Sequence, residues 1–127
     1  MKKEDVEKLE KTMGLLEGLH REMSALAKKS PNDGINTFKL RFLNSALSDA
    51  NDLLGEKYNP LEGFQQFDSD DVPTNSDAAF VLTSYLEEVE RMRADNIFND
   101  YNKWTYVLSD SEDKIRTAPP KKIKEKK

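Results

Sequence analysis

The chain has 127 residues, the length of one domain, and 35% of them are charged. It contains no cysteine and one histidine, His20, which excludes disulfides, thiolate zinc sites and paired-histidine metal motifs within one chain. No apolar run approaches the ~20 residues of a membrane span, and the first residues lack the apolar stretch of a signal peptide. We therefore expect a cytoplasmic protein that does not enter a membrane.

Charge is distributed unevenly along the chain. The formal net charge is −4, but residues 1–116 hold 15 Lys and Arg against 23 Asp and Glu, whereas residues 117–127 hold 5 Lys and 1 Glu. Pro119 and Pro120 stop any preceding helix, and the end beyond them has one large apolar residue, Ile123. These features predict one helical domain over 1–116 and a disordered basic tail over 117–127. The tail is either a solubilising end or a weak contact for nucleic acid or an acidic partner.

The first helix is predicted from about Lys3 to Lys29. Its apolar residues, with Leu9 and Leu16 among them, recur in steps of three and four, which is heptad spacing. This stripe suits a coiled-coil seam or, because neighbouring leucines widen it, the core of a bundle; Leu15 falls outside it. His20 lies on the stripe, either as a core-edge histidine with one local hydrogen bond or as a pH-sensitive position.

A second helix is predicted to end at Leu54, where Gly55 follows as a terminator. Its start is predicted at Ser30, which would cap a helix with Pro31 in the first position. Asn36 is an alternative cap one turn later. The short link to the first helix predicts that the two helices are antiparallel neighbours.

Residues 55–75 form a long, aromatic-rich connection. Asn59 and the proline after it predict a short helical turn over residues 60–66. Such a turn would place several large apolar side chains on one face: Tyr58, Leu61, Phe64 and Phe67. They either fasten the connection to the bundle or form an aromatic patch for a partner or ligand.

Residues 68–71 read Asp-Ser-Asp-Asp, but Val72 and Pro73 stand where a calcium loop needs an oxygen ligand and a glycine. We interpret this stretch as a solvated acidic turn.

A third helix is predicted to start at Thr74, which can cap it. A short fourth helix, or a bent continuation of the third, is predicted over about residues 99–108, with Trp104 as a packing residue.

Acidic side chains on the third helix are the candidate metal ligands. Glu87 and Glu90 lie three residues apart and Asp95 follows, so a carboxylate site for Mg²⁺ or Mn²⁺ is one interpretation. The spacing is similar to the acidic pairs of helical nucleotide pyrophosphatases, but a second matched pair and a glycine-rich phosphate loop are lacking. The simpler interpretation is that Arg91 and Arg93 form ion pairs with these acids on the helix surface.

Together these patterns predict an all-α, up-down helical bundle of three long helices plus a short fourth helix. No catalytic set of residues and no cofactor site is recognisable. We therefore expect a non-catalytic protein–protein interaction or assembly module that binds a protein partner or a second copy of itself. The alternatives are a Mg²⁺- or Mn²⁺-dependent nucleotide hydrolase and a protein that contacts nucleic acid through its tail. The candidate interaction residues are Leu9, Leu16, Tyr58, Phe64, Phe67 and Trp104.

Overall fold

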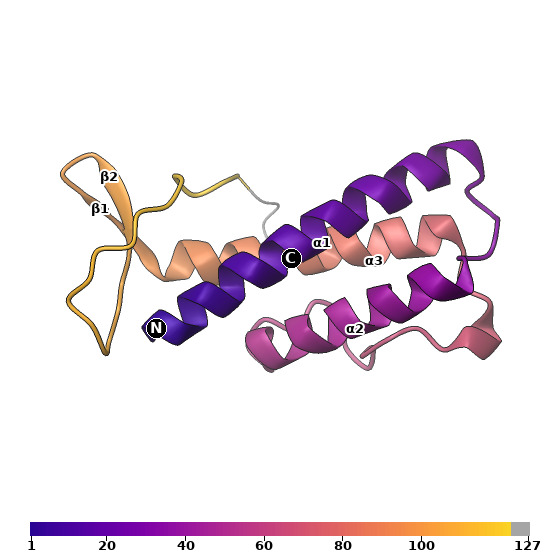
Figure 1. Ribbon diagram of the computed structural model, residues 1–127, viewed down its shortest axis with the longest axis horizontal. Helices are drawn as coiled ribbons and strands as arrows, with labels where there is room; N and C mark the ends of the chain where they lie inside the picture. Colours follow the sequence, from indigo (N-terminus) through magenta and orange to yellow (C-terminus); the bar gives the residue numbers. More distant parts are fainter. Residues whose placement is uncertain (123–127) are drawn as a thin grey trace.

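The computed structural model describes residues 1–122 and consists of three helices and a small antiparallel sheet (Figure 1). In chain order the elements are α1 (Lys3–Lys29), α2 (Thr37–Leu54), the 3₁₀ helix η1 (Ser69–Asp71), α3 (Asn75–Asp95), β1 (Ile97–Asp100) and β2 (Lys103–Tyr106). The fold is thus mainly helical, as predicted, but it is not an all-α bundle of four helices. Within residues 1–122, no helix combines the length and apolar character needed to cross a bilayer.

Helix α1 has the predicted bounds, and its heptad stripe is buried within the chain itself. Leu9 and Leu16 are fully buried, as are residues of α3 such as Leu82. At the far end of α1, the Asn75 side chain of α3 donates to the Ser30 carbonyl oxygen at 3.0 Å. The stripe therefore belongs to the core of a bundle, the second of the two interpretations.

Helix α2 begins at Thr37, six residues later than predicted. The Asn36 side chain caps it by accepting hydrogen bonds from the amides of Phe38 and Lys39, so the start at Ser30 is wrong and the alternative is confirmed. Residues 31–33 instead form a turn and a bend, and the Ile35 amide donates to the Pro73 carbonyl oxygen at 2.9 Å. At the other end Gly55 terminates the helix as predicted, with a φ of 63°.

Helices α2 and α3 run in the same direction, and both run antiparallel to α1 (Figure 1). Gly34, before α2, pairs with Thr74, before α3, and the Tyr58 hydroxyl after α2 reaches Asp95 at the end of α3. The predicted up-down order is therefore wrong. It fails because the connection after α2 is long enough to return along the bundle before α3 starts.

The connection between α2 and α3 is held by the polar face of α2. The Asn44 amide pairs with both backbone groups of Phe67, at 2.9 Å each, and Asn51 donates to the Gln65 carbonyl at 2.8 Å. The predicted helical turn over residues 60–66 is wrong, since these residues form turns and bends. Gly63, with a φ of 78°, interrupts any helix there.

A β-hairpin replaces the predicted fourth helix. Strands β1 and β2 pair from Ile97 opposite Tyr106 to Asp100 opposite Lys103, around a two-residue turn whose residues both have positive φ. Residues 115–117 continue the pairing along β2, through hydrogen bonds with Tyr106 and Trp104. The apolar spacing of this stretch fits a helix, but its β-branched and aromatic residues favour a strand.

Candidate functional site

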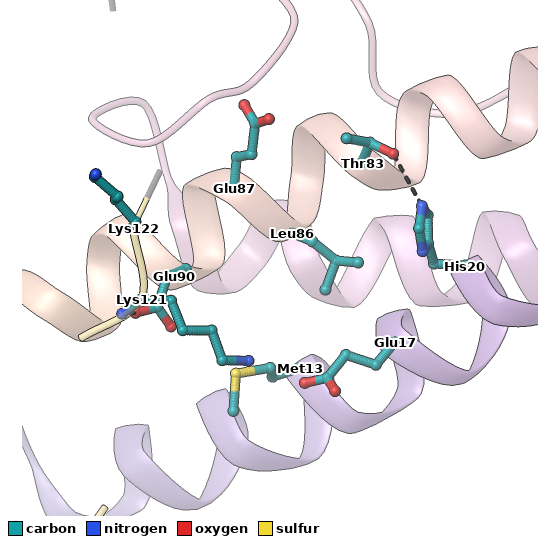
Figure 2. A pocket seen from close by; sticks show the side chains of 9 residues that line it. All are labelled: Met13, Glu17, His20, Thr83, Leu86, Glu87, Glu90, Lys121 and Lys122. Carbon is teal, nitrogen blue, oxygen red and sulfur yellow. Dashed lines mark hydrogen bonds between the residues drawn. The ribbon is translucent and has the colours of Figure 1, made fainter. Parts of the chain in front are cut away.

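A shallow groove of about 270 Å³ lies between α1 and α3 (Figure 2). Met13 from α1 and Leu86 from α3 form its apolar floor. The remaining lining residues are polar or charged: Glu17, His20, Thr83, Glu87, Glu90, Lys121 and Lys122. The groove therefore mixes carboxylates and amines, and it does not have the uniform charge that binding an ion would need.

His20 marks one end of this groove. Its Nε2 atom lies 2.9 Å from the Thr83 hydroxyl and 3.4 Å from that of Ser24. The side chain is partly exposed, so the interpretation of a core-edge histidine with a local hydrogen bond is confirmed. Both hydrogen bonds of the ring within residues 1–122 thus join it to hydroxyl groups, one on α3 and one on α1.

The three carboxylates considered as metal ligands do not converge. Glu87 points away from the α1 side of the groove in Figure 2. Glu90 is engaged by Arg93, and Asp95 accepts a hydrogen bond from Tyr58 at 2.6 Å. Within residues 1–122, no group of three or more Asp, Glu or His side chains is arranged to hold a metal ion.

Arg93 is the most deeply buried charge among the described residues, with 1% of its surface exposed. Its guanidinium forms a two-pronged ion pair with Glu90, at 2.8 and 2.9 Å. The predicted pairing of arginines with acids on α3 is confirmed, since Arg91 also pairs with Glu88, but the Arg93 pair lies in the interior and not on the surface. Burial acts to lower the pKa of Arg93, and Glu90 more than offsets this, so the pKa is raised and the charge is kept.

The remaining donors of Arg93 hold the start of the predicted tail. They reach the Thr117 hydroxyl and the carbonyl oxygens of Ala118 and Pro119, at 2.8, 2.8 and 2.9 Å. Glu90 also accepts the amide of Lys121 at 2.9 Å. This segment is thus tied to α3, whereas residues 123–127 of the predicted disordered tail lie outside the described residues.

The predicted interaction residues are placed mainly in the interior. Leu9 and Leu16 are fully buried, and Tyr58 is 8% exposed. The Phe64 ring contacts those of Phe67 and Tyr85 edge-on, with centroids 5.2 and 6.4 Å apart. These aromatic residues of the connection fasten it to the bundle, and Trp104 packs against the same core from the hairpin.

Tyr58 combines burial with a charged neighbour. Burial raises the pKa of its hydroxyl, and the hydrogen bond to Asp95 raises it further, to about 12. The hydroxyl therefore stays protonated and serves as a structural donor. It has no exposed position from which to act as an acid or base.

An apolar area on the surface is formed by four residues of α1 and α2, which we call the α1–α2 face: Leu15, Leu19, Phe38 and Phe42. They surround an open groove of about 290 Å³, which the buried Met23 also lines. Phe38 and Phe42 are 59% and 55% exposed, and Leu15 is 46% exposed. Large apolar side chains gathered in this way are typical of a surface that contacts another molecule.

The α1–α2 face is preorganised and edged by charges. The rings of Phe38 and Phe42 contact each other edge-on, with centroids 4.9 Å apart. The Arg41 guanidinium lies 5.7 Å from the centre of the Phe38 ring. Glu22 on α1 and Lys39 on α2 form an ion pair at the rim of the groove.

Comparisons with protein families, with curated proteins and with solved structures find no match to this chain. The function must therefore be argued from the geometry of the chain itself.

The α1–α2 face is absent from the sequence-based predictions, although a sequence signal for it exists. Phe38 and Phe42 are four residues apart, on the opposite side of the helix from the buried stripe of Leu40, Leu43 and Leu47.

Proposed function

We propose that the protein is a cytoplasmic, non-catalytic interaction or assembly module, and that it binds other polypeptides through the α1–α2 face. The observation that carries this proposal is the contiguous exposure of Phe38, Phe42 and Leu15 on two neighbouring helices. Burying a phenylalanine side chain contributes about 1.5–3 kcal/mol, so two such residues at one groove are enough to anchor a partner.

Two features favour a polypeptide over a small molecule as the partner. The groove is open to solvent and is lined by residues of both α1 and α2, so that it is not an enclosed cavity for a small molecule. Its rim carries both signs of charge, from Glu22, Lys39 and Arg41, which suits the mixed polar edge of a protein interface.

The proposal is tested by placing a photo-crosslinking phenylalanine analogue at position 42, in cells that naturally make the chain. We expect an adduct with a polypeptide, identified by mass spectrometry, that excess purified wild type displaces. The double variant Phe38→Ser/Phe42→Ser should not displace it. A chain carrying the analogue at position 80 is the matched control, because Phe80 is 64% exposed but lies on α3.

The same adducts at positions 42 and 80, or equal displacement by wild type and the double variant, would contradict the proposal. The double variant must also be folded. Since both rings are exposed, we expect its unfolding free energy to stay within about 0.5 kcal/mol of wild type for each substitution.

A further inference from the structure

Residues 117–122 lie against α3 and lead to the groove between α1 and α3. Side chains of α3 hold this segment by its backbone, through the carbonyl oxygens of Ala118 and Pro119 and the amide of Lys121, at 2.8, 2.9 and 2.9 Å. Lys121 and Lys122 then line the groove, whose volume is about 270 Å³. The described part of the chain therefore stops at a fixed place, directly beside an open groove.

The last two described side chains show how the segment is turned. Figure 2 shows Lys121 extending over the groove toward Met13, whereas Lys122 points to the opposite side of the segment. Alternation with a period of two residues is what an extended chain gives, at about 3.3 Å per residue. Continued for one residue, it brings Ile123, which lies outside the described residues, to the same side as Lys121, about 7 Å further along.

The floor of the groove suits an apolar side chain. Met13 of α1 and Leu86 of α3 form this floor, and both are only partly buried by the described residues. Ile123 is the single large apolar residue within 117–127. An isoleucine on this floor removes apolar surface of all three side chains from water, which favours the contact.

The walls of the groove carry the charge opposite to that of the segment. Glu17 on α1 and Glu87 on α3 line the groove, and within residues 1–122 neither forms an ion pair. Residues 121–127 hold five lysines against one glutamate. Lys121 already extends toward Glu17 in Figure 2, so these carboxylates are placed to attract the lysines of this segment.

We propose that the groove between α1 and α3 is the docking site of the chain's own residues 123–127, with Ile123 on the apolar floor and the lysines beside the two wall carboxylates. Docked there, the segment closes the groove to other molecules. This site is separate from the α1–α2 face, and the proposal goes beyond the proposed function without resting on it.

The test is methyl NMR of the full chain. We expect nuclear Overhauser contacts from the δ1-methyl group of Ile123 to the methyl groups of Met13 and Leu86. In Ile123→Ser, the Met13 and Leu86 methyl signals should move to the positions that they have in a chain truncated after Lys122. Val107→Ser is the matched control, because Val107 is 48% exposed and does not line the groove, and it should leave both signals unchanged.

The role of charge is tested by Lys124→Glu. We expect this reversal to shift the same two methyl signals toward their positions in Ile123→Ser, because a glutamate in the docked segment faces like charges on the groove walls. Lys103→Glu, an exposed reversal on the hairpin, is the control and should cause no shift. Equal signals in the two reversals would overturn the role given to the wall carboxylates.

Two results would overturn the docking itself. One is the absence of contacts between Ile123 and both floor residues in the full chain. The other is a pair of methyl signals that are the same in wild type and in Ile123→Ser, because the groove would then be left for a different occupant. Neither result bears on the proposed function, which fails separately if position 42 forms no displaceable adduct with a polypeptide.

Discussion

Tyr58 shows how a single residue after a helix can fasten two elements. Its ring is part of the core, and its hydroxyl donates to Asp95 at the end of α3. The sequence pattern marks the ring as a candidate interaction residue but does not decide whether it is buried or exposed. Whether the ring is buried depends on the path of the connection between α2 and α3, and no local sequence pattern reveals that path.

The raised pKa of Tyr58 predicts a specific alkaline transition. The pKa is about 12 in the folded protein and 10.0 in the unfolded chain, so the folded state favours the protonated hydroxyl. Its contribution to stability is complete below the unfolded value and is lost as the pH rises through the folded value. The tyrosinate absorbance of wild type minus that of Tyr58→Phe should titrate near pH 12; a difference that titrates near the unfolded value would contradict this.

Arg93 is the residue whose removal should lower the free energy of unfolding the most. Arg93→Ala leaves Glu90 buried without its countercharge and also releases Thr117, Ala118 and Pro119. We expect it to lower the free energy of unfolding by about 3–5 kcal/mol in urea titrations. The control is Lys114→Ala, because Lys114 forms an exposed ion pair with Asp100 and its loss should leave stability close to that of wild type. Equal losses in the two variants would show that the Arg93 pair is not structurally important.

At the level of elements, local signals predicted some boundaries well. The bounds of α1 and the capping of α3 by Thr74 follow from residues close together in the chain, and both are confirmed. The hairpin was missed because the apolar residues of 97–108 fit a helical spacing. Its strands are also stabilised by residues 115–117, which pair with β2 from further along the chain.

Asn44 anchors the connection between α2 and α3, although the sequence pattern shows only that this residue lies on the polar face of its helix. Asn44 satisfies both the amide and the carbonyl of Phe67, and both groups are partly buried. We expect Asn44→Ala to lower the unfolding free energy by about 1–3 kcal/mol and to speed amide exchange at Phe67. Ser45→Ala, at an exposed neighbouring position, should change neither quantity. An unchanged exchange rate at Phe67 would argue against this anchoring.

At the level of the whole molecule, the sequence predicted the helices but not their directions. A heptad stripe on α1 fits a partner in the same chain as well as one in another chain, and here α3 covers it. The residues left for an intermolecular contact are therefore those outside the stripe, such as Leu15, Phe38 and Phe42. Which apolar residues remain exposed becomes clear only after the helices are packed, so the candidate site could not be located from the stripe alone.

The central claim is that the α1–α2 face serves association and not folding. The most direct test compares wild type and Phe42→Ser in displacing the polypeptide adduct at position 42, with urea unfolding of both chains as the check on folding. We predict that wild type displaces the adduct and that Phe42→Ser does not. The two free energies of unfolding should agree within about 0.5 kcal/mol, since the Phe42 ring is exposed. Equal displacement by the two chains, or a Phe42→Ser free energy of unfolding well below that of wild type, would contradict the claim.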